Sequence, residues 1–97
     1  MEKRGFVYIL TNRSNNVLYL GVTSDLATRL HQYRTGMYKN SFTSRHNVNK
    51  LVYYEEFLSI ADAIFREKQL KAGSRKKKIE LIERRNKEWD DLSKQYF

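Results

Sequence analysis

The chain has 97 residues, of which 40% are hydrophobic, and this is enough for one modest core but not for two. It contains no cysteine, so disulfides and thiolate metal ligands are excluded, and two histidines argue against a structural zinc site. Nineteen Lys and Arg residues against eleven Asp and Glu give a net charge of +8 at pH 7, which favours a polyanionic partner. Because the longest apolar run, residues 17–22, is too short to span a bilayer, we expect one cytoplasmic domain over residues 1–97 and no membrane partner.

The first expected element is a β-hairpin. Two runs rich in aromatic and β-branched side chains, residues 6–10 and 17–22, flank a polar segment of turn composition. A loop of two or four residues pairs Tyr8 with Gly21 and puts Tyr8 and Tyr19 on the same face of the hairpin, whereas a loop of three residues separates them. The register therefore decides whether the two tyrosines can form one site. A glycine inside a strand, as at Gly21, often marks the close approach of a ligand or another group.

Thr23-Ser24-Asp25 is expected to supply the N-cap and an acidic first turn of a helix that runs from about Asp25 to Tyr33 or Gly36. Its apolar stripe consists of Leu26, Leu30 and Tyr33. Arg29 flanks this stripe, where a guanidinium can hold a phosphate in a bidentate grip or can simply extend over apolar neighbours. Residues 37–47 lack a clear period and are interpreted as a loop, and residues 49–57 as a third strand.

Two further helices follow. Ser59 with Asp62 three residues later resembles a capping box, and the helix that it begins is expected to reach Ala72 and to stop at Gly73. Ser74 can cap the next helix, whose apolar residues are Ile79, Leu81 and Ile82. Trp89 and Leu92 are expected to fold back and anchor the C-terminal tail. Asn86 suits the C-cap of the last helix.

Glu67 is the most informative polar residue of the chain. At about 100° per residue it falls in the middle of the apolar arc formed by Ile60, Ala63, Ile64 and Leu70, so its carboxylate is expected to point toward the core. An unpaired buried charge would cost several kcal/mol, and the carboxylate must therefore meet a cation. One alternative is a buried salt bridge with Arg29 or another base. The other is a hard divalent cation such as Mg²⁺, which needs only one or two protein carboxylates.

The basic residues from Lys68 to Lys78 and the pair Arg84-Arg85 are interpreted mainly as solvated helix faces, although they could follow a phosphate backbone. The sequence contains no Gly-rich phosphate loop, no His-Glu-x-x-His pattern and no nucleophile elbow. Common nucleotide-binding and protease chemistries therefore lose support.

The order and spacing of several short motifs resemble the GIY-YIG nuclease superfamily. The motifs are Phe6-Val7-Tyr8, Tyr19-Leu20-Gly21, Asp25 to Leu30, Arg66-Glu67 and Asn86-Lys87-Glu88-Trp89. The chain is most similar to small stand-alone members, which resemble the nuclease domain at the N-terminus of an excinuclease component. The resemblance implies an α+β fold in which a three-stranded antiparallel sheet is flanked by helices.

The resemblance also implies a set of site residues and their roles. The active site would consist of Tyr8, Tyr19, Arg29, Tyr33, Glu67 and Asn86. Glu67 would hold one Mg²⁺ or Mn²⁺ ion, Arg29 would bind the scissile phosphate, and one tyrosine would help to activate water. Two positions depart from the pattern: Phe6 replaces the first glycine, and Val22 stands where excinuclease-like members often carry a lysine that can lower a tyrosine pKa.

The leading hypothesis is a metal-dependent endonuclease that hydrolyses phosphodiester bonds in DNA, with RNA as another substrate and DNA repair or processing as its context. The alternative is a non-catalytic nucleic-acid-binding module, in which the charge of +8 provides affinity and Glu67 supports structure. An adaptor that acts on another protein has no positive support in the sequence.

Overall fold

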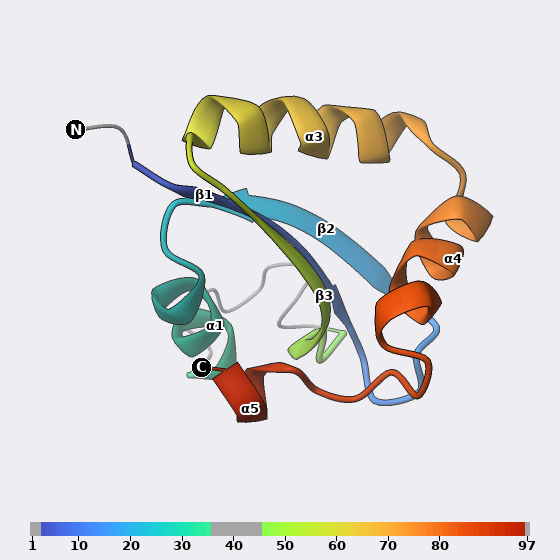
Figure 1. Ribbon diagram of the computed structural model, residues 1–97. Helices are drawn as coiled ribbons and strands as arrows, with labels where there is room; N and C mark the ends of the chain where they lie inside the picture. The colour runs from blue at the N-terminus through green and yellow to red at the C-terminus, as the bar shows by residue number, and fades with distance from the viewer. Residues whose placement is uncertain (1–2, 36–45, 97) are drawn as a thin grey trace.

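The computed structural model describes residues 3–35 and 46–96. Three strands, β1 (Gly5–Thr11), β2 (Leu18–Thr23) and β3 (Lys50–Phe57), form an antiparallel sheet in the order β2-β1-β3. The helices are α1 (Leu26–Arg34), α3 (Ile60–Ala72), α4 (Arg75–Arg85) and the short α5 (Ser93–Tyr96). The predicted α+β class, a three-stranded antiparallel sheet flanked by helices, is confirmed (Figure 1). Most of the expected loop 37–47 lies outside the described residues.

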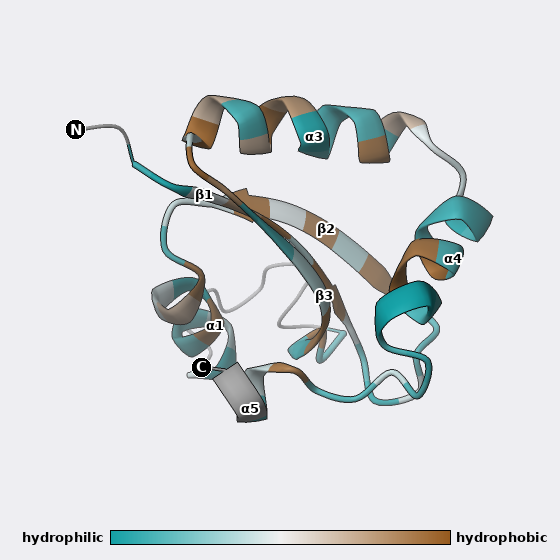
Figure 2. Ribbon diagram, in the orientation of Figure 1, coloured by the Kyte–Doolittle hydropathy of each residue, from teal (hydrophilic) through white to brown (hydrophobic). Residues whose placement is uncertain are grey.

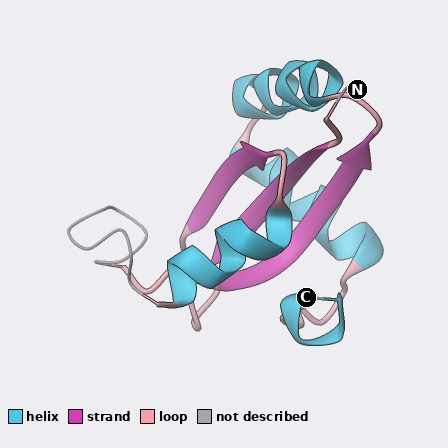
Figure 3. Cartoon of the chain, turned by 90° about the vertical axis from the view of Figure 1, so that its left-hand side faces the viewer, coloured by secondary structure: helices cyan, strands magenta, loops and turns pink. Residues whose placement is uncertain are grey.

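The sheet is sandwiched between two layers of helices. Helices α1 and α5 lie on one face, and α3 and α4 lie on the other (Figures 1 and 3). Strand β1 is central, and its four consecutive residues from Val7 to Leu10 are buried because successive side chains enter opposite layers. One core cluster, on the α1 side, contains Tyr8, Leu10, Leu26, Leu30, Val48 and Leu51. The other contains Ile9, Val52, Tyr53 and Ile82.

Helix α3 lies unusually close to the start of β1. A Cβ atom on Gly5 would lie 2.6 Å from the Cβ of Ala63 and 2.8 Å from the Cα of Ile60, so glycine permits this approach. Ala63 is the fully buried residue of the helix. The prediction that Ile64 points inward is wrong, because the close crossing covers only a narrow strip of the helix and leaves Ile64 40% exposed.

The predicted helix caps are confirmed. Asp25 Oδ1 accepts a hydrogen bond from Thr28 N at 3.1 Å, and Ser59 Oγ accepts one from Ala61 N at the same distance. Ser74 Oγ caps α4 in the same way, at 3.2 Å from Lys77 N. These side chains satisfy N–H groups that the first turn of a helix leaves unpaired. Figure 2 shows the resulting helices with brown apolar strips beside teal polar ones.

The C-terminal segment runs along the outer edge of β3 and anchors the tail as predicted. Leu92 N donates to the carbonyl of Leu51 at 2.8 Å, and Leu51 N donates to Asp91 Oδ1 at 3.2 Å. Trp89 packs against the second core cluster. These hydrogen bonds occupy the backbone N–H and carbonyl of Leu51 at the sheet edge, which could otherwise pair with another strand. The described helices include none with the length and hydropathy needed to cross a membrane.

Candidate active site

The hairpin register brings the two motif tyrosines onto one face of the sheet. Tyr8 pairs with Gly21 and Leu10 pairs with Tyr19, which is the register that a loop of even length predicts. Because side chains alternate along a strand, Tyr8, Tyr19 and Gly21 all face the layer that contains α1. The condition set by the sequence for a shared site is therefore met.

Gly21 makes room for the ring of Tyr8. A Cβ atom at position 21 would lie 2.4 Å from both the Cζ and the hydroxyl oxygen of Tyr8, a separation that atoms do not tolerate. The group that approaches the glycine closely is thus the Tyr8 ring. Tyr8 is only 2% exposed.

Tyr33 of α1 joins the two strand tyrosines. Its hydroxyl lies 3.0 Å from that of Tyr8, within hydrogen-bonding distance. Its ring centroid is 6.3 Å from that of Tyr8 and 6.1 Å from that of Tyr19, in tilted and edge-on arrangements that suit aromatic pairs. The three tyrosines, Tyr8, Tyr19 and Tyr33, are called the tyrosine cluster below.

The cluster keeps Tyr33 protonated. Burial raises the pKa of Tyr33 well above its usual value near 10, and hydrogen bonds with Tyr8 and Tyr19 raise it further. Tyr33 is consequently a phenol at neutral pH that can donate its proton in a hydrogen bond to a neighbouring tyrosine oxygen.

Arg29 lies one helical turn before Tyr33 on α1. Residues four apart in a helix are neighbours on its surface, and Arg29 is half-buried where Leu26 and Leu30 are fully buried. Its guanidinium therefore lies at the border between the packed face and solvent, next to the tyrosine cluster. Such a position suits binding of a phosphate, because a guanidinium carries five N–H donors on a rigid plane.

Glu67 comes from the other layer. Helix α3 packs on the side of β1 that Gly5 faces, opposite the side of Tyr8, and it also contacts β2. The Glu67 side chain is 14% exposed, and its Oε2 lies 3.4 Å from the Nζ of Lys71. The carboxylate therefore has a cationic partner, as its position in the helix required. Lys71 is itself 65% exposed, so this pair contributes only about 0.3–0.5 kcal/mol and can open at little cost.

The donor set around Glu67 fits one kind of metal ion. Within the described residues there is no group of three His, Cys, Asp or Glu side chains that could enclose a metal, which argues against zinc-type coordination. A single carboxylate paired with an exposed lysine suits a hard divalent cation that takes most of its ligands from water and phosphate oxygens. Glu67 would hold such an ion.

Asn86 has a structural environment. It caps α4, where its backbone N–H bonds the carbonyl of Ile82 at 2.8 Å, and the residue is 6% exposed. Its amide nitrogen donates to the carbonyls of Val52 and Asp90, and its Oδ1 accepts from Asp90 N. The side-chain amide is thus occupied by backbone groups of β3 and the tail. The active-site role that the resemblance implies for Asn86 stays a prediction.

A second polar cluster, around strand β3, was not predicted from the sequence. Tyr53 donates a hydrogen bond to Glu55, and the Nε of Arg66 lies 3.2 Å from Glu55 Oε1. Arg85 lies over the Tyr53 ring, 5.4 Å from its centroid, and donates to the carbonyl of Tyr54. The alternation of Tyr53 and Glu55 on one strand face was a signal that could have revealed it.

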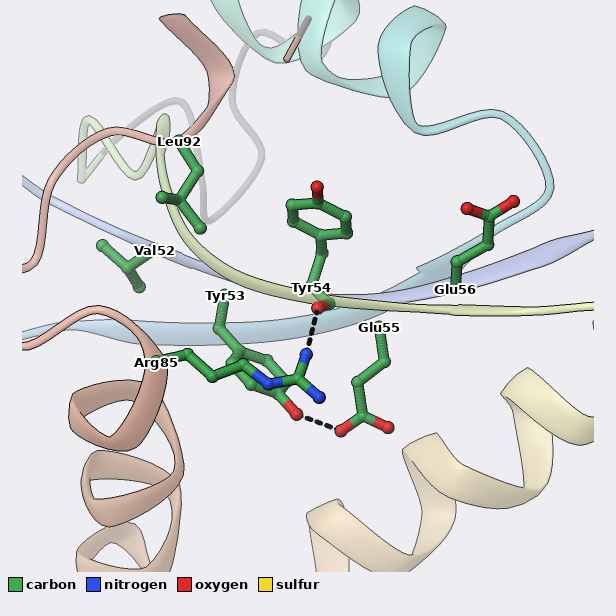
Figure 4. A pocket seen from close by; sticks show the side chains of 7 residues that line it. All are labelled: Val52, Tyr53, Tyr54, Glu55, Glu56, Arg85 and Leu92. Carbon is green, nitrogen blue, oxygen red and sulfur yellow. Dashed lines mark hydrogen bonds between the residues drawn. The ribbon is translucent and has the colours of Figure 1, made fainter. Parts of the chain in front are cut away.

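This cluster borders a hollow of about 260 Å³ at the outer edge of β3, lined by Val52, Tyr53, Tyr54, Glu55, Glu56, Arg85 and Leu92 (Figure 4). Figure 4 shows Arg85 reaching across the strand edge, where it caps a carbonyl that no strand pairs. Tyr53 and Glu55 bind each other, and Glu55 and Glu56 also pair with Arg66 and Arg4, which do not line the hollow, so its two carboxylates are already partnered.

We expect Tyr53 to make stability fall in strong alkali. Burial, followed by the hydrogen bond to Glu55, raises the pKa of Tyr53 from 10.0 to about 12. The folded state therefore favours the protonated phenol, and this contribution is complete below pH 10 and is lost as the pH rises from 10 to 12. A shift of two units corresponds to roughly 2–3 kcal/mol. Urea unfolding of the parent and of Tyr53→Phe should show the parent losing that much more stability across this window. Equal losses would contradict the prediction.

Comparison with known proteins assigns the chain to a family. Residues 4–80 match the GIY-YIG catalytic domain. The match includes both motif tyrosines, Arg29, Tyr33 and Glu67, and it ends before Asn86. The chain therefore belongs to the GIY-YIG family.

Its relatives are small proteins of similar length. A UPF0213 protein of Syntrophus aciditrophicus (strain SB) is 35% identical over 79 residues, which cover 81% of this chain and 90% of the relative. UPF0213 protein SH2523 of Staphylococcus haemolyticus is 35% identical over 80 residues, covering 82% and 95%. The solution NMR structure of UPF0213 protein BH0048 from Bacillus halodurans superposes with a TM-score of 0.58 at 26% identity and covers 96% of this chain and 97% of that one. The chain is thus similar over most of its length to the UPF0213 proteins.

Proposed function

We propose that this protein is a metal-dependent endonuclease that hydrolyses phosphodiester bonds in DNA. The observation that carries the proposal is the hydroxyl contact of 3.0 Å between Tyr8 and Tyr33, over Gly21 and one helical turn from Arg29 on α1. A buried, mutually hydrogen-bonded set of phenols next to a half-buried guanidinium suits phosphate chemistry better than simple packing, because it combines proton-transfer groups with an anion-binding group.

The proposal assigns each residue of the site a role that agrees with its chemistry and its exposure to solvent. Arg29 binds the non-bridging oxygens of the scissile phosphate and neutralises the charge that accumulates there. Tyr19 is half-buried on the edge strand β2, whereas Tyr8 is 2% exposed, so Tyr19 is the tyrosine that can reach an attacking water. Tyr19, in its ionised form, accepts the proton of that water as the water oxygen bonds to phosphorus, while the bond from phosphorus to the ester oxygen breaks and the departing oxygen takes a proton from solvent. Tyr8 and protonated Tyr33 orient Tyr19 and stabilise its charge.

A divalent cation held by Glu67 would supply charge neutralisation at the phosphate and acidify a bound water. Because Glu67 comes from the opposite layer, the proposal requires its carboxylate to meet the phosphate around the edge of β2, the strand that carries Tyr19. Helix α3 contacts β2, which is compatible with this requirement.

Because position 22 is a valine and not a lysine, other groups must stabilise an ionised tyrosine. Ionising a tyrosine of pKa near 10 at pH 7 costs on the order of 4 kcal/mol, and no lysine follows Gly21 to reduce this cost. In the proposal, the positive charges of Arg29 and of the metal ion offset this ionisation cost.

The proposal is tested by cleavage of duplex and single-stranded DNA with Mg²⁺ or Mn²⁺, in the parent and in Glu67→Gln. We expect the substitution to lower the cleavage rate about a hundredfold or more, because it removes one essential charged ligand while it preserves the shape of the side chain. Asp62→Asn is the matched control, since it removes an exposed carboxylate from the first turn of the same helix. It should cleave like the parent.

Two outcomes would contradict the proposal. In the first, the parent cuts no nucleic acid with either metal although it binds it, which would indicate a non-catalytic binding module. In the second, Glu67→Gln cuts as fast as the parent, which would remove Glu67 from the reaction. If the protein cleaves RNA faster than DNA, RNA and not DNA would be its substrate.

A further inference from the structure

The positive charge of the protein is concentrated in one short segment. Residues 68–78 contain six Lys or Arg side chains and no Asp or Glu. The rest of the chain holds thirteen basic and eleven acidic side chains and is therefore nearly neutral. The excess of +8 is thus mainly a property of this segment and not of the surface as a whole. We call residues 68–78 the basic segment.

The basic segment forms a continuous surface across two helices. It begins in the second half of α3, passes through the Gly73–Ser74 connection and continues into the first turn of α4. Figure 1 shows this corner of the molecule at the upper right, where the two helices meet, and Figure 2 shows the start of α4 in the teal of polar residues. Its basic side chains are exposed except that of Lys78, which is half-buried.

Internal contacts do not explain these charges. In the part of the chain that the structure describes, Lys71 forms the single ion pair of the segment, with Glu67. Arg75 donates to the carbonyl of Asn16 at 2.8 Å, and Lys78 donates to the carbonyl of Gly73 at 2.8 Å. Backbone carbonyls satisfy hydrogen bonds without neutralising charge, so the segment keeps its positive potential.

The position of four of these cations at the start of α4 also argues against a role in stabilising the fold. Arg75 to Lys78 occupy the first turn of α4, where the helix dipole is positive, and that turn holds no acidic residue. A cation near a helix N-terminus is unfavourable by about 0.3–1 kcal/mol, and neighbouring like charges add repulsion. The fold therefore loses stability by keeping four cations here. An external polyanion would reverse the sign of both effects.

We propose that the basic segment binds the phosphodiester backbone of the DNA strand that flanks the scissile phosphate. The inference rests on the proposed nuclease function for the identity of the polyanion. Lys71 stands one turn beyond Glu67, about 6 Å along the helix axis, and the segment continues from there onto α4. Because phosphates of one strand follow every ~3.4 Å along the duplex axis, the segment covers phosphates a few nucleotides from the one at Glu67. It aligns the strand without reading its sequence.

The test measures the salt dependence of DNA binding. A labelled short duplex is titrated in EDTA, which prevents cleavage, at salt concentrations from about 50 to 200 mM. For the double variant Lys76→Gln/Lys77→Gln we expect the slope of log affinity against log salt to fall in magnitude by about two, and affinity near 0.1 M salt to fall tenfold or more. Thermal stability should stay unchanged or rise, because two cations leave a helix N-terminus.

The matched control removes the same charge from the other end of α4. Arg84→Gln/Lys87→Gln changes two exposed residues and gives an identical net charge. Its slope should stay within about 0.5 of the parent value. Equal losses in both double variants would overturn the inference, because net charge alone would then explain binding. Equally strong competition by polyglutamate or by anionic lipid vesicles would also overturn it, because the surface would not prefer a phosphodiester backbone.

Glu67→Gln separates this inference from the proposed function. In EDTA it should bind DNA at least as tightly as the parent, because the substitution removes a negative charge and releases Lys71 from its ion pair, although it should no longer cut DNA. If the parent binds through the basic segment but never cuts DNA, the nuclease proposal fails and the binding surface stands. If the parent cuts DNA while Lys76→Gln/Lys77→Gln binds as the parent does, the binding surface is refuted and the nuclease proposal stands.

Discussion

Gly21→Ala is expected to break the hydrogen bond between Tyr8 and Tyr33 and to destabilise the fold by about 2 kcal/mol. The new Cβ would lie 2.4 Å from Cζ and the hydroxyl oxygen of Tyr8. The ring cannot rotate away at no cost, because Tyr8 is 2% exposed and packed in the core cluster on the α1 side. The pKa of Tyr33 should fall toward its usual value, because the contact with Tyr8 contributes to raising it. Absorbance titration of the tyrosines and urea unfolding measure the two effects.

A double-mutant cycle gives the control for this prediction. In a Tyr8→Leu background the ring is absent, so Gly21→Ala should change the free energy of unfolding little or should even raise it. The reason is that glycine in a strand interior is about 0.5–1 kcal/mol less favourable than alanine. A similar loss of stability from Gly21→Ala in both backgrounds would mean that the Tyr8 ring is not the group that requires glycine.

Gly5→Ala should destabilise the protein more, by about 3 kcal/mol, because the added methyl group meets a helix backbone and not only a side chain. Its Cβ would lie 2.8 Å from the Cα of Ile60 and 2.6 Å from the Cβ of Ala63. Helix α3 can relieve this contact only by moving away from β1, and Glu67 would move with it. For a protein of this size the melting temperature should fall by roughly 10–20 °C.

Gly73→Ala is the matched control for Gly5→Ala. The nearest heavy atom to a Cβ at position 73 is the carbonyl oxygen of Leu70 at 3.4 Å, and the backbone φ of −81° suits alanine. The same chemical change should therefore be neutral or stabilise the protein by up to about 1 kcal/mol, through the lower entropy of the unfolded chain. If the two variants melt alike, close packing of α3 on Gly5 is not a determinant of stability.

The local elements could be predicted because their signals lie close together in the chain. Asp25, Ser59 and Ser74 cap helices where the sequence indicated, since a cap needs only the side chain and the next few N–H groups. The hairpin and its strand boundaries were likewise readable from composition. Helix α5 was not, because four residues are too few to show a period.

Three features of the candidate site depended on longer-range contacts. The hairpin register remained open between even and odd loops until the pairing of Tyr8 with Gly21 was known. The hydrogen bonds of Asn86 join it to Val52, 34 residues away in the chain. The cluster of Tyr53, Glu55 and Arg66 links a strand to a helix, and only the packing of the two elements brings the carboxylate and the guanidinium together.

By itself, the sequence determined the helix caps and the need of Glu67 for a cation, because each of these follows from residue type and local spacing, whereas the α+β class was implied by the resemblance to the GIY-YIG family. Lys71 also stands at the spacing of a helical neighbour, so the pair could have been read from the chain. Only the tertiary structure decided that the hydroxyl of Tyr33 meets that of Tyr8 while Glu67 comes from a helix on the opposite layer of the sheet. A helix can pack on either face of a sheet with the same amphipathic pattern, and the close approach of α3 to Gly5 accompanies its packing on one face here.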